Sequence, residues 1–275
     1  MINNKLFTGL AACILTGALT ACDNIDENDR YIPVERPEIS RVVLIQEFTG
    51  MNCVNCPNGA AVLHNLQDQF PGSVIVVGMH PENNPNTTPL AGLNLTNPLA
   101  TAYYDYFQPN AFPAAMVNGG ELMYNTDLWT TSVIEALRVP AAVDLQVTTT
   151  YDPTSRELKA DFETVFNQMY SGDLSVLLWV MENDIHGLQM SLGGKVLVDY
   201  SHNHVLRGSL NGTWGEQIGQ NFVTEQKITG SGSIILDEKW VPENCEVVAL
   251  VFQSSNKTVE QAALAPAIES EDSES

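Results

Sequence analysis

The stretch from Val42 to Cys56, VVLIQEFTGMNCVNC, constrains the fold of this chain more than any other stretch. It opens with a continuous apolar run, Val42–Ile45, which is typical of a strand buried on both faces. A short turn follows, and Cys53 and Cys56 then stand directly before Pro57 and a helical pattern. Free N–H groups and the positive dipole end of a helix stabilise a thiolate at its first turn, so we expect a lowered pKa for Cys53. The pattern therefore indicates a redox-active cysteine pair at the start of a helix.

This arrangement resembles the active-site approach of the thioredoxins. The resemblance implies that Glu47, six positions before Cys53, is a buried carboxyl that takes and returns the proton of Cys56 during exchange. It also implies that Pro113 opens a strand opposite the cysteines through a cis bond to Phe112. The sequence departs from the family at the residue before the first cysteine, which is Asn rather than Trp, and in the Val-Asn dipeptide between the cysteines.

Distinct roles follow for the members of this candidate catalytic site. We predict that Cys53 is the exposed nucleophile, at the N-cap or first turn of the helix. Cys56 lies about one turn further on and should face inward, toward Glu47, where it resolves the mixed disulfide. Burial should raise the pKa of Glu47 because a buried carboxylate loses hydration. This chemistry requires no cofactor.

The composition of the chain is that of a globular protein with a large core. Its 275 residues are 44% hydrophobic and carry a formal net charge of −21. Such an acidic chain is a poor partner for nucleic acid or anionic lipid headgroups. Exported protein thiols or disulfides are the partners we expect, and host or extracellular proteins are further candidates.

The N-terminus carries a targeting signal. Residues 1–21 combine Lys5 with an apolar run and end in Leu19-Thr20-Ala21, directly before Cys22. This resembles the lipobox of bacterial lipoproteins, in which the cysteine is lipidated and the signal peptide is removed. A transmembrane helix is the alternative, but the apolar run is short for a bilayer. Several acyl chains on Cys22 would give a stable anchor. Residues 22–38 form an acidic tether, and residues 269–275 a disordered acidic tail.

Residues 39–140 are predicted to form an α/β thioredoxin-like domain. A second apolar run at Val74–Val77 completes a strand–helix–strand crossover. Asn97-Pro98 starts a further helix, and two short strands are expected on either side of Asn118-Gly119-Gly120. The closing helix begins near Thr126. We expect this domain to fold on its own.

From residue 141 the hydrophobic period changes from helical to alternating. Runs at 143–148 and 158–162 flank Asp152-Pro153, a turn signal, and four further strands are expected. They cover 174–181, 205–210, 228–236 and 247–252. Residues 141–268 are therefore predicted to form an all-β antiparallel sandwich.

Three other features have weaker functional interpretations. His202 and His204 share a face of an extended segment and His186 could join them, but no acidic or cysteine signature completes a metal site, so none is predicted. Cys245 is the unpaired cysteine of the second domain, which fits a buried core residue or a reactive thiol. His80 follows a predicted strand and either lines the site or has no role.

Motifs from both predicted domains resemble one further family. They are Phe48–Pro57, Tyr200–Arg207 and Trp240–Leu250, together with the lipobox. The chain is similar in these to the 28-kDa outer-membrane-protein-related lipoproteins of Gram-negative anaerobes. That resemblance implies an anchor in the outer membrane, at the cell surface or on the periplasmic side, and members are described as surface antigens or adhesin-like proteins.

Two functions are consistent with the sequence. In the first, the chain is a thiol–disulfide oxidoreductase that uses Cys53, Cys56, Glu47 and Pro113. In the second, it is a non-enzymatic surface antigen, adhesin or binding lipoprotein in which Cys53–Cys56 is a static disulfide. The motifs favour redox chemistry, and the large second domain favours binding.

Overall fold

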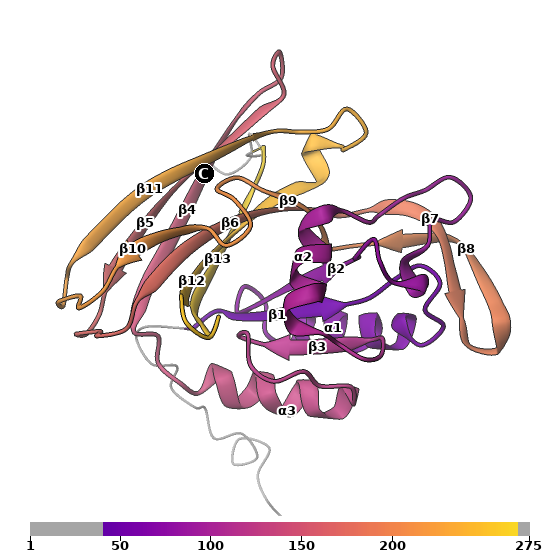
Figure 1. The fold of residues 1–275 in the computed structure, drawn as a ribbon, viewed down its shortest axis with the longest axis horizontal. Helices are drawn as coiled ribbons and strands as arrows, with labels where there is room; N and C mark the ends of the chain where they lie inside the picture. The colour runs from indigo at the N-terminus through magenta and orange to yellow at the C-terminus, as the bar shows by residue number, and fades with distance from the viewer. Residues whose placement is uncertain (1–40, 269–275) are drawn as a thin grey trace, which may run out of the picture. The chain divides into compact units, whose positions relative to one another are not determined.

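The computed structural model describes residues 41–268, which belong to one compact unit. The predicted signal peptide, the lipid site at Cys22, the whole tether and the acidic tail lie outside the described residues. Within 41–268 the strands form a mixed eight-stranded sheet, an antiparallel three-stranded sheet and a two-stranded hairpin (Figure 1). The fold is mostly β. Among the described residues, no helix is both long and apolar enough to cross a bilayer.

The crossover that follows the first strand is confirmed. Strand β1 (Val43–Phe48) is followed by helix α1 (Cys56–Gln69) and by strand β2 (Val74–Met79), which runs parallel to β1. Every residue of both strands is buried, in keeping with their unbroken apolar runs. The carboxyl ends of the two strands lie together, and this is the edge from which α1 and the cysteines start.

Two further helices and one strand complete this half of the fold. Helix α2 (Pro98–Phe107) starts at Asn97, whose side chain accepts a hydrogen bond from the backbone N–H of Ala100. Strand β3 (Ala114–Val117) is antiparallel to β1, and helix α3 (Thr126–Leu137) follows it. The prediction of a second short strand after Asn118-Gly119-Gly120, at residues 122–124, is wrong. A single bridge joins Met123 to Ala115 there. Helices α1 and α3 contribute to one apolar cluster with β1 and β2, and α2 contributes to another.

The remaining strands follow α3 in chain order. They are β4 (Val143–Asp152), β5 (Glu157–Phe166), β6 (Leu174–Glu182), β7 (Ile185–Ser191), β8 (Lys195–His202), β9 (Val205–Ser209), β10 (Glu216–Gly219), β11 (Lys227–Ile235), β12 (Cys245–Gln253) and β13 (Val259–Pro266). Short 3-10 turns lie at Pro85–Thr87, Leu192–Gly194 and Pro242–Asn244. The predicted hairpin and all four further strands are present, and β7, β8, β10 and β13 are additions that the sequence interpretation missed.

The second half of the fold packs two sheets face to face. One layer is the three-stranded sheet in the order β11-β5-β4, and the other contains β6, β12 and β13. Alternate residues of β5, including Leu158 and Phe162, share an apolar cluster with Val176 of β6 and Val247 of β12. This matches the face-to-face packing expected of a sandwich.

The structure differs from the expected separate all-β sandwich in how its strands are paired. The large sheet has the order β13-β12-β6-β9-β2-β1-β3, so strands from both sides of Pro140 form one mixed sheet. Strand β9 makes the connection, because Val205 pairs with Gly78 of β2 while the strand runs antiparallel to β6. Periodicity marks the end of α3 near Pro140, but it does not show which strands pair across that point.

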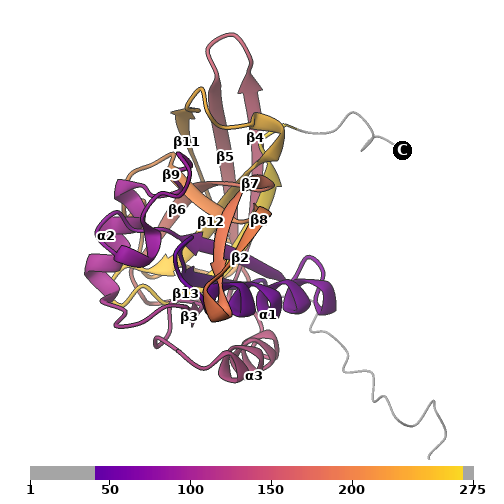
Figure 2. The same ribbon diagram turned by 90° about the vertical axis from the view of Figure 1, so that its right-hand side faces the viewer.

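The hairpin β7–β8 pairs with neither larger sheet. It lies at the right of Figure 1 and faces the viewer in Figure 2. Its turn contains Gly193 and Gly194, both at positive φ, which glycine adopts without steric cost. The side chains of Leu192, Val196 and Val198 are exposed near this turn. Gln189 and Met190, near the turn end of β7, contact the loop that carries Cys53.

Candidate functional site

Cys53 and Cys56 are joined by a disulfide between the end of β1 and the start of α1. The sulfurs are 2.10 Å apart and the two Cα atoms 5.4 Å apart. Asn55 is the N-cap and Pro57 occupies the first turn, so α1 begins at Cys56 and Cys53 precedes the helix. The predicted position of Cys53 at the N-cap or first turn is therefore wrong by two residues, and Cys56 is the cysteine nearest the dipole end.

Both cysteines are buried in this disulfide state, each with 3% of its surface exposed. The expectation of an exposed Cys53 is therefore wrong for the oxidised protein. The carboxamide nitrogen of Gln189, in β7, donates to the carbonyls of Cys53 at 3.1 Å and Gly50 at 3.2 Å. The backbone N–H of Met190 donates to the carbonyl of Met51 at 2.8 Å. The part of β7 next to the hairpin turn thus covers the segment that carries Cys53.

Residues 86–88 form a second segment that covers the loop carrying Cys53. The backbone N–H of Asn52 donates to the carbonyl of Asn86 at 2.8 Å, and its side chain donates to the carbonyl of Thr88 at 2.7 Å. Gly50 allows this approach, since a Cβ there would lie 2.3 Å from the Asn86 carbonyl oxygen. The two covering segments, β7 and residues 86–88, are distant in sequence from the cysteine motif. The motif alone therefore did not predict them.

Glu47 is buried in β1, and desolvation raises its pKa from 4.5 to about 8, as the sequence predicted. Its Oε1 atom has no hydrogen-bond partner among the described residues. Gly59 lets α1 lie against this carboxyl, because a Cβ there would be 2.9 Å from Glu47 Oε1 and 3.1 Å from Pro113 Cγ. Gly59 is a site residue that the sequence interpretation missed. A glycine inside a helical pattern was the available signal.

Pro113 is brought to the same place. Its bond to Phe112 is cis, which confirms that part of the prediction. The ring lies beside Gly59 of α1, on the side where Glu47 approaches. The fold therefore gathers Cys56, Glu47 and Pro113 around the first turns of α1.

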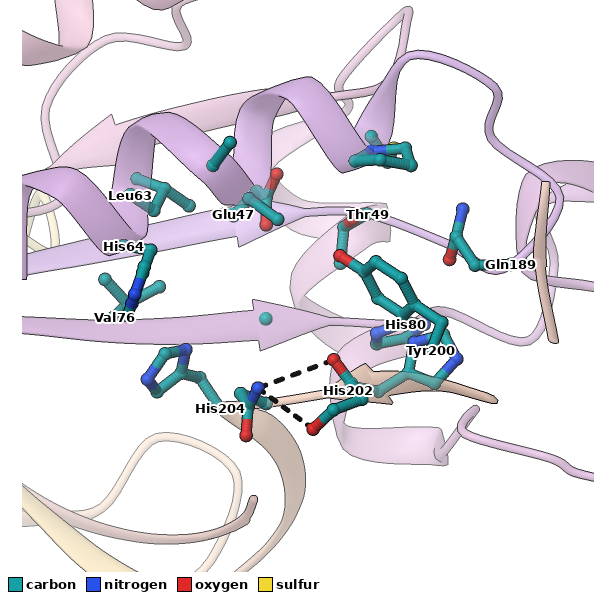
Figure 3. A pocket seen from close by; sticks show the side chains of 17 residues that line it. Glu47, Thr49, Leu63, His64, Val76, His80, Gln189, Tyr200, His202 and His204 are labelled. Carbon is teal, nitrogen blue, oxygen red and sulfur yellow. Dashed lines mark hydrogen bonds between the residues drawn. The ribbon is translucent and has the colours of Figure 1, made fainter. Parts of the chain in front are cut away.

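A cavity of about 350 Å³ opens beside Cys56 (Figure 3). One wall is α1, the floor is the end of β1 and β2, and the opposite wall is β8 with the residues after it. The lining residues include Glu47, Cys56, His64, His80, Gln189, Tyr200, His202 and His204. Figure 3 shows His80, His202 and Tyr200 together near one end, and His64 with His204 at the other.

The buried histidines of this cavity are uncharged at neutral pH. Desolvation, together with the positive charges of His202 and Arg207, lowers the pKa of His80 to about 3. Burial likewise lowers the pKa of His202 and that of His204 to about 4. Of the two interpretations of His80, the structure shows the one in which it lines the cavity. Its Nδ1 atom has no hydrogen-bond partner among the described residues.

His186 and Cys245 are not lining residues of this cavity. His186 is exposed and contacts Asp184 at 3.0 Å and Asp199 at 2.6 Å, so it does not join His202 and His204. Within the described residues no group of three or more His, Cys, Asp or Glu side chains could hold a metal ion. Cys245 is a free, buried thiol of β12 whose pKa is raised to about 12, first by desolvation.

A family model described as outer membrane protein Omp28 matches residues 100–268. Because this match covers more than half of the 275 residues, the chain belongs to the Omp28 family of outer membrane proteins. The predicted location, a lipid anchor at the outer membrane, agrees with this membership. The cysteine pair precedes the matched region, so family membership does not by itself define its chemistry. No curated protein matches the chain in sequence.

Solved structures with similar folds share little sequence with it. HBP35 of Porphyromonas gingivalis is 15% identical with a TM-score of 0.64, over 83% of this chain and 76% of that one. AGR_C_4864 from Agrobacterium tumefaciens is 15% identical with a TM-score of 0.51, over 84% and 96%. A domain of the outer membrane lipoprotein Omp28 from Porphyromonas gingivalis is 18% identical with a TM-score of 0.33, over 46% of this chain and 87% of that one. The first two likenesses show the fold alone.

Proposed function

We propose that this outer membrane protein exchanges thiols and disulfides through Cys53 and Cys56. The observation that carries the proposal is a disulfide-bonded C-x-x-C before a helix, with a buried carboxyl on the same cavity as its second cysteine. The order β1-α1-β2-α2-β3-α3, with the Pro113 ring beside Gly59 of α1, supports a thioredoxin-like unit around this site.

The proposed reaction needs only groups of this chain and a partner thiol or disulfide. One cysteine attacks the partner's disulfide as a thiolate, and the other cysteine resolves the mixed disulfide that forms. The carboxyl of Glu47 is protonated at pH 7, below its pKa of about 8, so it can give a proton to a thiolate and recover it later. The backbone beside Pro113 would bind a partner chain in an extended form.

The lipid anchor belongs to this proposal as well. Cys22 would carry acyl chains at the outer membrane, and residues 23–38 would link them to the compact unit. Exported proteins with thiols or disulfides are the partners that such a location would supply.

Catalysed reduction of insulin by dithiothreitol tests the proposal. Residues 23–275 should accelerate insulin precipitation, and the Cys53→Ser and Cys56→Ser variants should not, because each lacks the pair. A Cys245→Ser variant is the matched control, since that thiol is buried far along the chain in β12, and it should keep the activity. Equal rates for the parent chain and the two pair variants would overturn the proposal.

One observation favours a second function. Both cysteines are buried, and the hairpin β7–β8 and residues 86–88 hold the backbone around Cys53, as expected for a static disulfide. In that case the chain would be a non-enzymatic surface antigen, adhesin or binding lipoprotein. A lack of reaction both with insulin and with small disulfides would favour this alternative.

A further inference from the structure

The two sulfurs of the disulfide have different surroundings. Cys56 lines the cavity beside α1, whereas Cys53 is not among its lining residues. The segment around Cys53 is held by Gln189 and, through Asn52, by the carbonyl of Asn86. A molecule that enters the cavity therefore meets Cys56 first.

The cavity fits a small uncharged molecule. Its volume of about 350 Å³ lies near the lower end of the range for small-molecule sites. At pH 7 Glu47 is protonated and His80, His202 and His204 are neutral, since the pKa values lie on the corresponding sides of 7. A fixed charge on an entering molecule would lose its hydration here without gaining an opposite charge.

Two side chains near the cavity already have partners. The positive charge of Arg207 helps to lower the pKa of His80 and of His202. Its Nε atom lies 2.7 Å from a carboxylate oxygen of Glu182. His64, at the other end of the cavity, lies 3.5 Å from Asp68 on the same helix.

Two buried polar atoms in the cavity wall lack a partner in the described part of the chain. They are Oε1 of Glu47 and Nδ1 of His80. A buried polar atom gains stability from a hydrogen bond, so a ligand with a hydroxyl or similar group would be held here. The cavity thus combines a reactive sulfur with groups that bind a small polar molecule.

We propose that Cys56, rather than Cys53, is the sulfur attacked from solution, and that its reaction partner is a low-molecular-weight thiol with no other charged group. This inference rests on the proposed exchange function and specifies its substrate class. A protein disulfide would need the cover over the cysteines to open, whereas a small thiol needs only the cavity.

The reaction balances without a further reactant. The thiolate of the small thiol attacks Sγ of Cys56, a new S–S bond forms there, and the bond to Cys53 breaks. The sulfur of Cys53 leaves with the electron pair and ends as a thiol, carrying a proton equivalent to the one lost by the attacking thiol. A second thiol then attacks the adduct, which releases the small disulfide and leaves both cysteines reduced.

Single-cysteine variants of residues 23–275 identify the reactive sulfur. Cys53→Ser leaves Cys56, and Cys56→Ser leaves Cys53, with Cys245 present in both. Each reduced variant is treated with 2-hydroxyethyl disulfide, which is small and uncharged, and adduct formation is followed by mass spectrometry. We expect Cys56 to react at least about tenfold faster than Cys53. Equal rates, or a faster Cys53, would overturn the assignment.

The unmutated protein gives an independent measurement. Oxidised residues 23–275 are treated briefly with 2-mercaptoethanol, quenched with acid, alkylated, and fragmented to locate the adduct. The adduct should sit on Cys56, and an adduct on Cys53 would contradict the inference even if a single-cysteine variant failed to fold.

Narrowing the cavity tests the route. Ala60→Leu places a larger side chain in the wall, and Asn65→Leu places the same side chain on an exposed position of α1 outside the cavity. We expect Ala60→Leu to slow the reaction of 2-hydroxyethyl disulfide several-fold and Asn65→Leu to leave it unchanged. The charged, larger glutathione disulfide should react more slowly than 2-hydroxyethyl disulfide in the parent chain.

The outcomes separate the two proposals. If neither cysteine reacts with any disulfide, the exchange function is wrong and this inference falls with it. If the pair reacts but does so through Cys53, or equally fast with glutathione disulfide, only the inference is wrong.

Discussion

The ionisation of Glu47 is linked to folding. Because burial raises its pKa from 4.5 to about 8, the folded chain holds a proton that the unfolded chain has lost at pH 7. Glu47 therefore lowers stability progressively as the pH rises from about 4.5 to about 8, and the penalty is absent below that window. A shift of this size corresponds to roughly 3–5 kcal/mol at most.

Replacing Glu47 with Gln should remove this pH dependence. The Glu47→Gln variant should gain stability relative to the parent chain as the pH rises from 5 to 8, by up to a few kcal/mol. Urea unfolding at several pH values measures the difference. Glu82→Gln, at an exposed acid, is the control and should show no such trend. A stability difference for Glu47→Gln that stays constant with pH would contradict the account.

At the residue scale the sequence indicated the cysteine pair and the buried carboxyl. It did not indicate the segments that bury Cys53. Val43–Phe48 and the C-x-x-C spacing predicted the strand, the pair and the buried carboxyl, because these depend on neighbouring residues. The burial of Cys53 depends on Gln189, which lies 136 positions away and forms no motif with the cysteines. Gln189 could not be recognised as part of the site from local pattern. Gly59 gave a local signal, a glycine inside a helical pattern, but nothing nearby showed that it faces Glu47 and Pro113.

The hairpin β7–β8 is the element that controls access to Cys53. Gln189→Ala removes the hydrogen bonds to the carbonyls of Cys53 and Gly50, so the cover should open more often. We expect iodoacetamide to modify reduced Cys53 at least several-fold faster in this variant. Lys195→Ala, near the turn of the hairpin, is the control and should behave like the parent chain. Unchanged modification of Cys53 in Gln189→Ala would show that the hairpin does not restrict access.

The hairpin also shows where element prediction was incomplete. Gly193-Gly194 between two short apolar segments is a hairpin signal that was available in the sequence. The strands it joins carry polar residues on both faces, including His186 and Asp199, so alternation there is weak. By contrast, β6 and β12 are almost wholly apolar and were predicted within one or two residues.

At the scale of the whole molecule, one sheet joins the two predicted domains. Leu44 and Val77 share an apolar cluster with Trp179 and Leu250, which come from beyond Pro140. Trp179 also donates from Nε1 to the hydroxyl of Tyr103 in α2, at 2.8 Å. Periodicity identified the change of architecture at Pro140, but the pairing across it is set by contacts between distant segments.

Independent folding of the first half is therefore not what the structure favours. A fragment of residues 38–140 would expose the edge of β2 and the apolar surface that Trp179 and Leu250 cover. We expect it to show no cooperative unfolding in urea, whereas residues 23–275 should unfold in one transition. A cooperative transition of the fragment would support the independent domain that the sequence indicated.

Attachment to the membrane is a separate property of the whole molecule. Cells that express the parent chain should incorporate radioactive palmitate into it, and cells that express Cys22→Ser should not. The reason is that Cys22 is the predicted site of acylation after Leu19-Thr20-Ala21. Equal label in both proteins would rule out this site.

The reduction potential of the Cys53–Cys56 pair tests the central claim most directly. Residues 23–275 are equilibrated in dithiothreitol redox buffers, and the fraction of reduced pair is read by mass spectrometry after alkylation. An exchange protein should show a potential between about −120 and −270 mV, the range of known exchange catalysts. A potential below about −300 mV would mark a static structural disulfide and contradict the proposed function.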